Sequence, residues 1–162
     1  GARIFDRLES WKFAELADRI YKKYNLKILF TWGPEQKELV DQIIPKIKNA
    51  PYGLLSSNLQ ELGAITLRAQ FIVCHNGGYM HMVSVLGTPV VALFGWANPA
   101  IWKPIGDKSE VVYKNLECSP CGSKTIKSEC LAGDPECKRL ITVDDIISAI
   151  KKVYFPPIIA NE

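Results

Sequence analysis

Residues 71–95 read FIVCHNGGYMHMVSVLGTPVVALFG, and this stretch decides the fold. Its pattern predicts a buried strand, a turn with two adjacent glycines, a helix and a second buried strand. A helix that begins directly after such a turn leaves its first backbone N–H groups unpaired at the positive end of the helix dipole. Because Gly77 and Gly78 carry no side chain, a ligand can approach the main chain closely. The turn predicts a phosphate site for a nucleotide or sugar phosphate; the alternative is that the glycines only turn the chain.

Two common nucleotide-binding motifs are absent from this stretch. The Lys-Ser/Thr pair of the P-loop does not follow the glycines. The Gly-x-Gly-x-x-Gly pattern of dinucleotide-binding proteins is also missing, because the next glycine after Gly78 is Gly87. We therefore expect neither a P-loop NTPase nor ordinary NAD binding.

The length and composition are typical of one globular domain. The chain has 162 residues, 48% of them hydrophobic, which is enough for a single core. We assign residues 1–155 to this domain and residues 156–162 to a tail. The net charge is +3 with acidic and basic residues interspersed, so we expect no nucleic-acid partner. No apolar run reaches the roughly 18 to 20 residues that span a bilayer, and we expect a cytoplasmic location without a transmembrane segment.

Predicted helices and strands alternate along the chain. Ser10 is expected to cap the first helix, Ser57 with Gln60 to form a capping box, and Thr142 with Asp145 to cap the last helix. The predicted strands, in chain order, are residues 26–30, 71–74, 90–94 and 111–113.

This alternation defines the expected fold class. Apolar strands separated by amphipathic helices predict a parallel sheet covered on both faces, in a Rossmann-like three-layer α/β/α domain. Ligands of such sheets bind at the carboxyl ends of the strands. The turns at residues 32–35, 76–78 and 94–96 are expected to lie together at that edge.

The same residues carry a family resemblance. The run from Cys74 to Gly95, with Leu59-Gln60-Glu61-Leu62 before it and Cys118-Ser119-Pro120-Cys121 after it, resembles the C-terminal, donor-binding half of the lipopolysaccharide heptosyltransferases, glycosyltransferase family 9. The positions that match the family pattern as they stand are Met80, His81, Gly87, Thr88, Pro89, Phe94 and Gly95. Asn76 replaces the usual Asp and Gly77 the usual Ser or Thr, so the backbone of the turn is kept while an acidic side chain is lost.

The resemblance implies a GT-B glycosyltransferase, with two Rossmann-like domains, that transfers heptose from an ADP-sugar with inversion. It implies that the turn and helix start hold the donor diphosphate, through Asn76, Gly77, Gly78, Tyr79, Met80 and His81. Glu35 would accept bonds from the ribose hydroxyls. The family's lysine shortly before a tryptophan is missing, because Glu9-Ser10 precedes Trp11 here, and Arg7 is its possible substitute.

The resemblance also implies what lies outside this chain. The catalytic base is expected in an absent N-terminal, acceptor-binding domain, which would bring the lipid-linked saccharide acceptor to the cytoplasmic face of the inner membrane. No cofactor is expected, because fixed N–H donors can stabilise the charge that develops on the leaving diphosphate.

Each of these residues also has a purely structural interpretation. His81 could be a packed histidine at a helix start, and Glu35 a first-turn acid that complements the helix dipole. For His75 we expect a structural place at the strand end. Trp96 and Trp102 are more typical of a loop that covers a sheet edge than of a nucleotide site.

Four cysteines occur in the inserted loop 118–137, namely Cys118, Cys121, Cys130 and Cys137. Their spacing leaves three alternatives open, which are a structural zinc site, one or two disulfides, and free thiols. They also define the competing hypothesis on function, a non-catalytic α/β module whose cysteine-rich loop mediates assembly with another chain.

Overall fold

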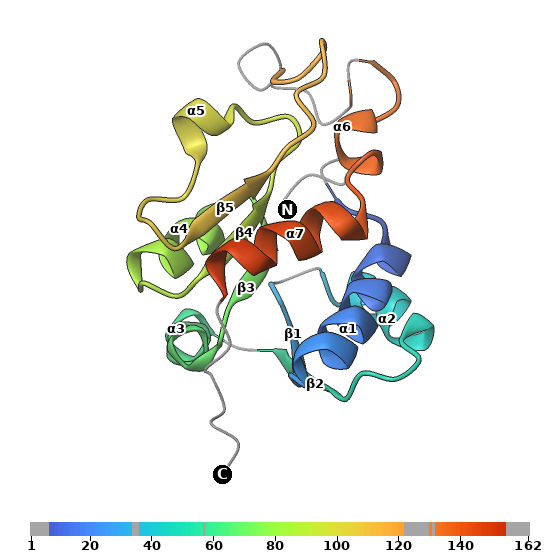
Figure 1. Cartoon of the computed structure of the whole chain (residues 1–162), viewed down its shortest axis with the longest axis vertical. Coiled ribbons are helices and arrows are strands. Elements are labelled where there is room, and N and C mark those ends of the chain that lie inside the picture. The colour runs from blue at the N-terminus through green and yellow to red at the C-terminus, as the bar shows by residue number, and fades with distance from the viewer. Residues whose placement is uncertain (1–6, 34–35, 57, 122–129, 131, 155–162) are drawn as a thin grey trace.

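The computed structural model describes residues 7–33, 36–56, 58–121, 130 and 132–154. Figure 1 shows helices packed around parallel strands. The elements in chain order are α1 (Ser10–Tyr24), β1 (Ile28–Trp32), α2 (Lys37–Ile43), the 3₁₀ turn η2 (Ile44–Lys46), β2 (Tyr52–Ser56), α3 (Leu59–Arg68), β3 (Ile72–His75), α4 (Gly78–Val85), β4 (Val90–Leu93), α5 (Pro99–Trp102), β5 (Ser109–Val112), α6 (Glu136–Arg139) and α7 (Val143–Val153).

All of the described strand pairs are parallel. β1 pairs with β2, with Ile28 opposite Tyr52. β4 lies between β3 and β5, and Val90 is opposite both Ile72 and Ser109. The strands therefore form a two-stranded and a three-stranded sheet in the part of the chain that the structure describes. The expected parallel α/β class is confirmed, although the ladder is not continuous from β1 to β3.

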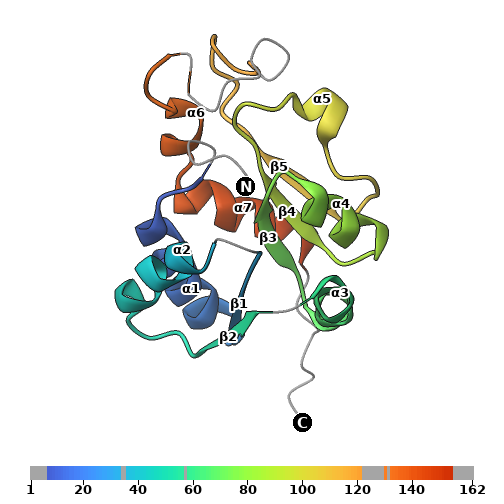
Figure 2. The ribbon, with the colours of Figure 1, turned by 180° about the vertical axis from the view of Figure 1, so that it is seen from behind.

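Helices cover both faces of the three-stranded sheet. α1 and α7 pack on one face, where Ile20, Val91, Leu93 and Ile146 belong to one buried cluster. α4 packs on the other face, as Figures 1 and 2 show from opposite sides. The buried residues of this second cluster are Met80, Val83, Val90, Ala92, Phe94 and Ala97. Successive strand residues thus point to opposite faces of the sheet and belong to two separate cores. This is the three-layer arrangement expected from the sequence.

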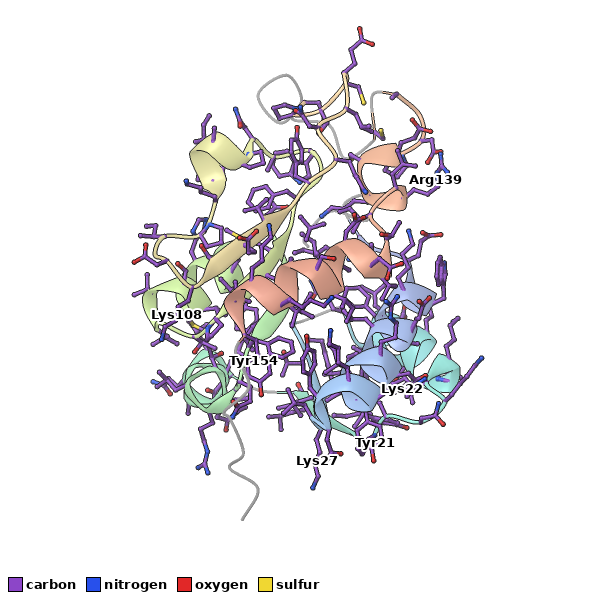
Figure 3. The ribbon with its side chains drawn as sticks, viewed as in Figure 1. Tyr21, Lys22, Lys27, Lys108, Arg139 and Tyr154 are labelled. Carbon is purple, nitrogen blue, oxygen red and sulfur yellow. The ribbon has the colours of Figure 1, made fainter. Side chains whose placement is uncertain are left out.

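Aromatic packing closes the first core after α7. The ring of Tyr154 lies 5.5 Å from that of Tyr24 and 5.1 Å from that of Phe71, measured between centroids. Figure 3 labels Tyr154 at the end of α7. The tail 156–162 follows and lies outside the described residues.

The helix starts confirm one expected cap and correct two. Thr142 and Asp145 form the predicted capping box of α7. The box of α3 is made by Asn58 and Glu61, so the prediction of Ser57 with Gln60 is wrong by one residue. The Glu61 carboxylate accepts from the Asn58 N–H and complements the helix dipole, which a neutral Gln60 does less well. Ser10 is already helical, and the residue before α1 is Glu9, without a side-chain cap bond.

The strands show small shifts from the predicted bounds and one omission. β1 continues through Trp32, which the sequence placed in a turn, while β4 ends one residue before the predicted end. β2 was not predicted, because Pro51 and Gly53 weaken its strand pattern. Within the described residues, no helix is long and apolar enough to cross a membrane.

Candidate functional site

The turn between β3 and α4 is built as the glycines predict. The last ladder bond of this segment runs from the N–H of Asn76 to the carbonyl of Leu93, over 3.1 Å. Gly77 then takes φ 156° and ψ −176° as the N-cap residue of α4. L-residues rarely adopt this backbone conformation, so the position favours glycine. The chain thereby leaves β3 and enters α4 within two residues.

The N–H groups of this turn have no acceptor among the described residues. The first bond of the helix joins the N–H of His81 to the carbonyl of Gly77, over 3.3 Å. No hydrogen bond to a described residue is made by the N–H groups that precede it, those of Gly77, Gly78, Tyr79 and Met80. They form a set of free donors at the positive end of a helix of eight residues.

The space in front of these donors is open. A Cβ atom placed on Gly77 or on Gly78 would meet no described heavy atom within 4 Å, and both glycines are exposed. The arrangement therefore meets the two conditions for anion binding at a helix start, which are free donors and an unobstructed approach.

Asn76 adds a buried polar atom without a partner. Its Oδ1 is buried and makes no hydrogen bond within the described part of the structure. Exchange of the amide oxygen and nitrogen would present N–H donors at the same place, because the two ends have nearly the same shape. In either orientation, a polar end of the Asn76 side chain is left unsatisfied directly before the glycines.

The side chains of the next two residues anchor α4. Met80 is fully buried in the second core cluster. The hydroxyl of Tyr79 lies 3.0 Å from Oγ1 of Thr66, a residue that is also fully buried. The backbone N–H groups of Tyr79 and Met80, and not their side chains, belong to the set of free donors. His81 is partly exposed in the first turn of α4.

The sequence predicted Glu35 as the residue that binds the ribose hydroxyls. Glu35 lies outside the described residues, between β1 and α2. On either side of it, the N–H of Gln36 donates to the carbonyl of Gly33 over 3.2 Å. Trp96 is partly exposed, while Trp102 is 55% exposed at the end of α5.

A buried lysine, which the sequence did not indicate, lies at the carboxyl ends of β3 and β4. Lys138 of α6 is 1% exposed, and its Nζ donates to the carbonyl of Leu93 over 2.7 Å. Burial, and then the charge of Lys138, hold the pKa of His75 well below its ordinary value. Burial raises the pKa of the Cys74 thiol to about 12. His75 thus has the structural place expected for it, and is neutral.

The cysteine-rich segment packs against the end of β4. The N–H of Cys121 donates to the carbonyl of Trp96 over 3.1 Å, and Oγ of Ser119 donates to the carbonyl of Gly95 over 2.5 Å. No disulfide joins the described cysteines, of which Cys118 is exposed and Cys137 buried. No three His, Cys, Asp or Glu side chains gather as metal ligands among the described residues.

A cavity in the described part of the structure lies away from the turn. It has a volume of about 300 Å³ and runs between β5 and α7. Two ion pairs bridge it, Lys114 with Asp145 at 2.7 Å and Lys152 with Glu110 at 3.2 Å. None of the turn residues lines this cavity, and its charged pairs satisfy each other.

A parallel sheet with helices on both faces and a glycine turn at its carboxyl edge defines a Rossmann-like α/β domain. The chain belongs to glycosyltransferase family 9 (heptosyltransferase), whose family model matches residues 7–132. This confirms the resemblance drawn from residues 74–95.

Curated relatives are heptosyltransferases. The lipopolysaccharide core heptosyltransferase OpsX of Haemophilus influenzae is 27% identical over 103 residues, which cover 62% of this chain and 29% of the relative. Lipopolysaccharide heptosyltransferase 3 of Escherichia coli is 26% identical over 106 residues, which cover 63% of this chain and 31% of the relative. The matched residues thus span less than a third of the length of either relative.

Solved structures with the same fold come from the same family. A family 9 glycosyl transferase of Veillonella parvula superposes with a TM-score of 0.76 at 23% identity, over 94% of this chain and 43% of that one. The E. coli ADP-heptose heptosyltransferase II superposes with a TM-score of 0.75 at 18% identity, over 92% of this chain and 42% of that one. The E. coli heptosyltransferase WaaC with ADP superposes with a TM-score of 0.69 at 15% identity, over 94% of this chain and 42% of that one.

Proposed function

We propose that this chain is the donor-binding half of an inverting glycosyltransferase of lipopolysaccharide core synthesis, with ADP-heptose as donor. The observation that carries the proposal is the set of free N–H donors at Gly77–Met80 in front of an open turn. Family membership supports it, and so does the presence of ADP in the structure of the related WaaC.

The chemistry assigns a clear task to the turn. Transfer of the sugar breaks its bond to the diphosphate, and negative charge develops on that leaving group. The N–H groups of Gly78, Tyr79 and Met80, with Asn76 and His81 beside them, would hold the diphosphate and stabilise this charge without a metal. Glu35 would bind the ribose hydroxyls. The catalytic base would come from an N-terminal, acceptor-binding domain, together with a lipid-linked acceptor at the cytoplasmic face of the inner membrane.

A thermal-shift titration with ADP tests the proposal. An ADP concentration of 100 times the dissociation constant should raise the free energy of unfolding by about 2.7 kcal/mol. Gly78→Val should abolish this shift while the fold survives, because its side chain would fill only the open space in front of the donors.

Gly63→Val is the matched control. Gly63 lies on α3, also with no described atom within 4 Å of an added Cβ, and its variant should bind ADP as the wild type does. Equal ADP shifts for the wild type and Gly78→Val would exclude the turn as the site. No shift of the wild type with ADP, UDP, GDP or their sugars would favour the alternative, a non-catalytic interaction module.

A further inference from the structure

We propose that the free edge of β5, with α7 beside it, is a docking surface for a second copy of this chain. Figure 1 shows β5 at the margin of the three-stranded sheet, with α7 alongside. Two copies pair their β5 strands antiparallel about a two-fold axis, so that their sheets become continuous. This surface is separate from the turn before α4, because that turn follows β3, which lies on the opposite side of β4.

The outer edge of β5 carries backbone groups without partners. The carbonyls of Lys108 and Val112 accept from N–H groups of β4 and the residue after it, over 2.9 Å each. Because alternate residues of a strand direct their backbone groups to opposite sides, those of Val111 and Tyr113 point away from β4. Both residues are partly exposed, and their N–H and C=O groups make no hydrogen bond within the described part of the chain. An edge of this kind can accept a further strand.

The groove beside this edge has charges in a self-complementary order. It is the cavity of about 300 Å³ between β5 and α7. At one end, Glu110 of β5 pairs with Lys152 of α7 over 3.2 Å. At the other end, Lys114 pairs with Asp145 over 2.7 Å. Each end therefore holds one acid and one base, and the strand supplies the acid at one end and the base at the other.

These charges and the free backbone groups favour the same register. Antiparallel pairing centred on Val112 places Glu110 of each copy opposite Lys114 of the other. It also places Val111 opposite Tyr113, so that the outward N–H and C=O groups of the two residues bond each other. The pairing continues two residues past the end of β5. A parallel pair in register would instead place like charges side by side, so the charges select the two-fold arrangement.

α7 leaves room for its counterpart in the second copy. The helix runs antiparallel to β5, because its first turn lies at Lys114 and its last turn at Glu110. Midway between these ends, the residues that line the groove are the small Ser148 and Ala149. Small side chains at a contact allow two helices to approach closely. The middle of the groove on α7 thus coincides with its middle on β5, as a two-fold axis requires.

Sedimentation equilibrium of the 162-residue chain tests the proposal. The wild type should show about twice its mass of 18.1 kDa, and the dimer should dissociate on dilution. Lys114→Glu and Glu110→Lys should each weaken self-association by more than about tenfold, because like charges then face each other. An equimolar mixture of the two variants should form a heterodimer, because every facing pair is then opposite in charge. A wild type that stays monomeric at about 1 mM would overturn the inference.

Lys37→Glu is the matched control. Lys37 forms an exposed ion pair with Asp41 on α2 over 2.7 Å, outside the groove. Its reversal should leave the dimer unchanged, and circular dichroism should show all three variants folded. If Lys114→Glu and Glu110→Lys dimerise as strongly as the wild type, the copies meet at another surface and the inference is wrong.

Amide hydrogen exchange in the wild type needs no variant. The N–H groups of Val111 and Tyr113 should exchange more slowly at a high protein concentration than at a low one, because the second copy covers them. The N–H of Val112 faces β4 and should exchange equally at both concentrations. A dimer in which Val111 and Tyr113 gain no protection would also overturn the inference.

Discussion

The backbone N–H of Leu8 donates to Nε2 of His75 over 2.9 Å. This bond joins the segment before α1 to the carboxyl end of β3, and Phe13 packs edge-on against the same ring with centroids 5.7 Å apart. An Nε2 that accepts a hydrogen bond carries no proton, so the ring proton is on Nδ1. Burial and the nearby Lys138 charge lower the pKa of His75, in agreement with a neutral ring.

This bond predicts a loss of stability at mildly acidic pH. The unfolded chain takes up a proton on His75 near the ordinary pKa of 6.5, whereas the folded protein resists protonation. The free energy of unfolding should therefore fall as the pH drops below about 6.5, by up to about 1.4 kcal/mol per pH unit. Urea unfolding between neutral pH and about pH 5 measures this slope.

His75→Gln is the control for this slope, since a glutamine oxygen can accept the Leu8 bond but does not titrate. Its slope above pH 5 should be much smaller. Asp18, whose pKa is lowered by bonds from the N–H groups of Lys48, Asn49 and Ala50 that outweigh its burial, acts only at lower pH. Equal slopes in wild type and His75→Gln would contradict the assignment.

The sequence predicted the turn but not the buried lysine that bonds the carbonyl of Leu93 near it. The Asn-Gly-Gly stretch and the helix after it are local features, so their geometry follows from neighbouring residues. Lys138 reaches Leu93 across 45 positions of sequence, and no pattern around it distinguishes a buried lysine from a surface one. A long-range contact of this kind depends on how α6 meets β4, which only the structure specifies.

Gly63 offers a stabilising substitution. It lies inside α3, where glycine costs conformational entropy, and an added Cβ would meet no described atom within 4 Å. Gly63→Ala should therefore raise the free energy of unfolding by about 0.5 to 1 kcal/mol. Chemical denaturation checks this value, and a destabilised variant would show that α3 needs the glycine for a closer approach than the structure has.

The cap of α7 predicts a loss of stability. The N–H of Asp145 donates to Oγ1 of Thr142 over 3.1 Å, and the Asp145 carboxylate accepts from the N–H of Thr142 over 2.7 Å. Thr142→Ala removes the first bond and should cost about 1 kcal/mol. Thr142→Ser keeps a hydroxyl and should recover most of this loss; if serine is no better than alanine, the hydroxyl bond is not the cause.

The predictability of the fold also depends on how local each signal is. Thr142 and Asp145 were identified correctly, because a capping box uses only four consecutive residues. Around α3 the box lies one residue later than the predicted Ser57 and Gln60, because the Glu61 side chain accepts from the N–H of Asn58. β2 was missed because Pro51 and Gly53 weaken its strand pattern, and its partner β1 lies more than twenty residues earlier in the sequence.

The thiols of Cys118 and Cys74 should differ strongly in reactivity. Cys118 is exposed, whereas burial raises the pKa of Cys74 to about 12, so only about one molecule in ten thousand carries the Cys74 thiolate at pH 8. Iodoacetamide at that pH should modify Cys118 first and leave Cys74 unmodified until urea unfolds the chain. Peptide mapping by mass spectrometry follows each site, and equal rates would contradict the burial of Cys74. Protection of Cys118 that a chelator removes would support the zinc alternative, and protection that a reductant removes would support a disulfide.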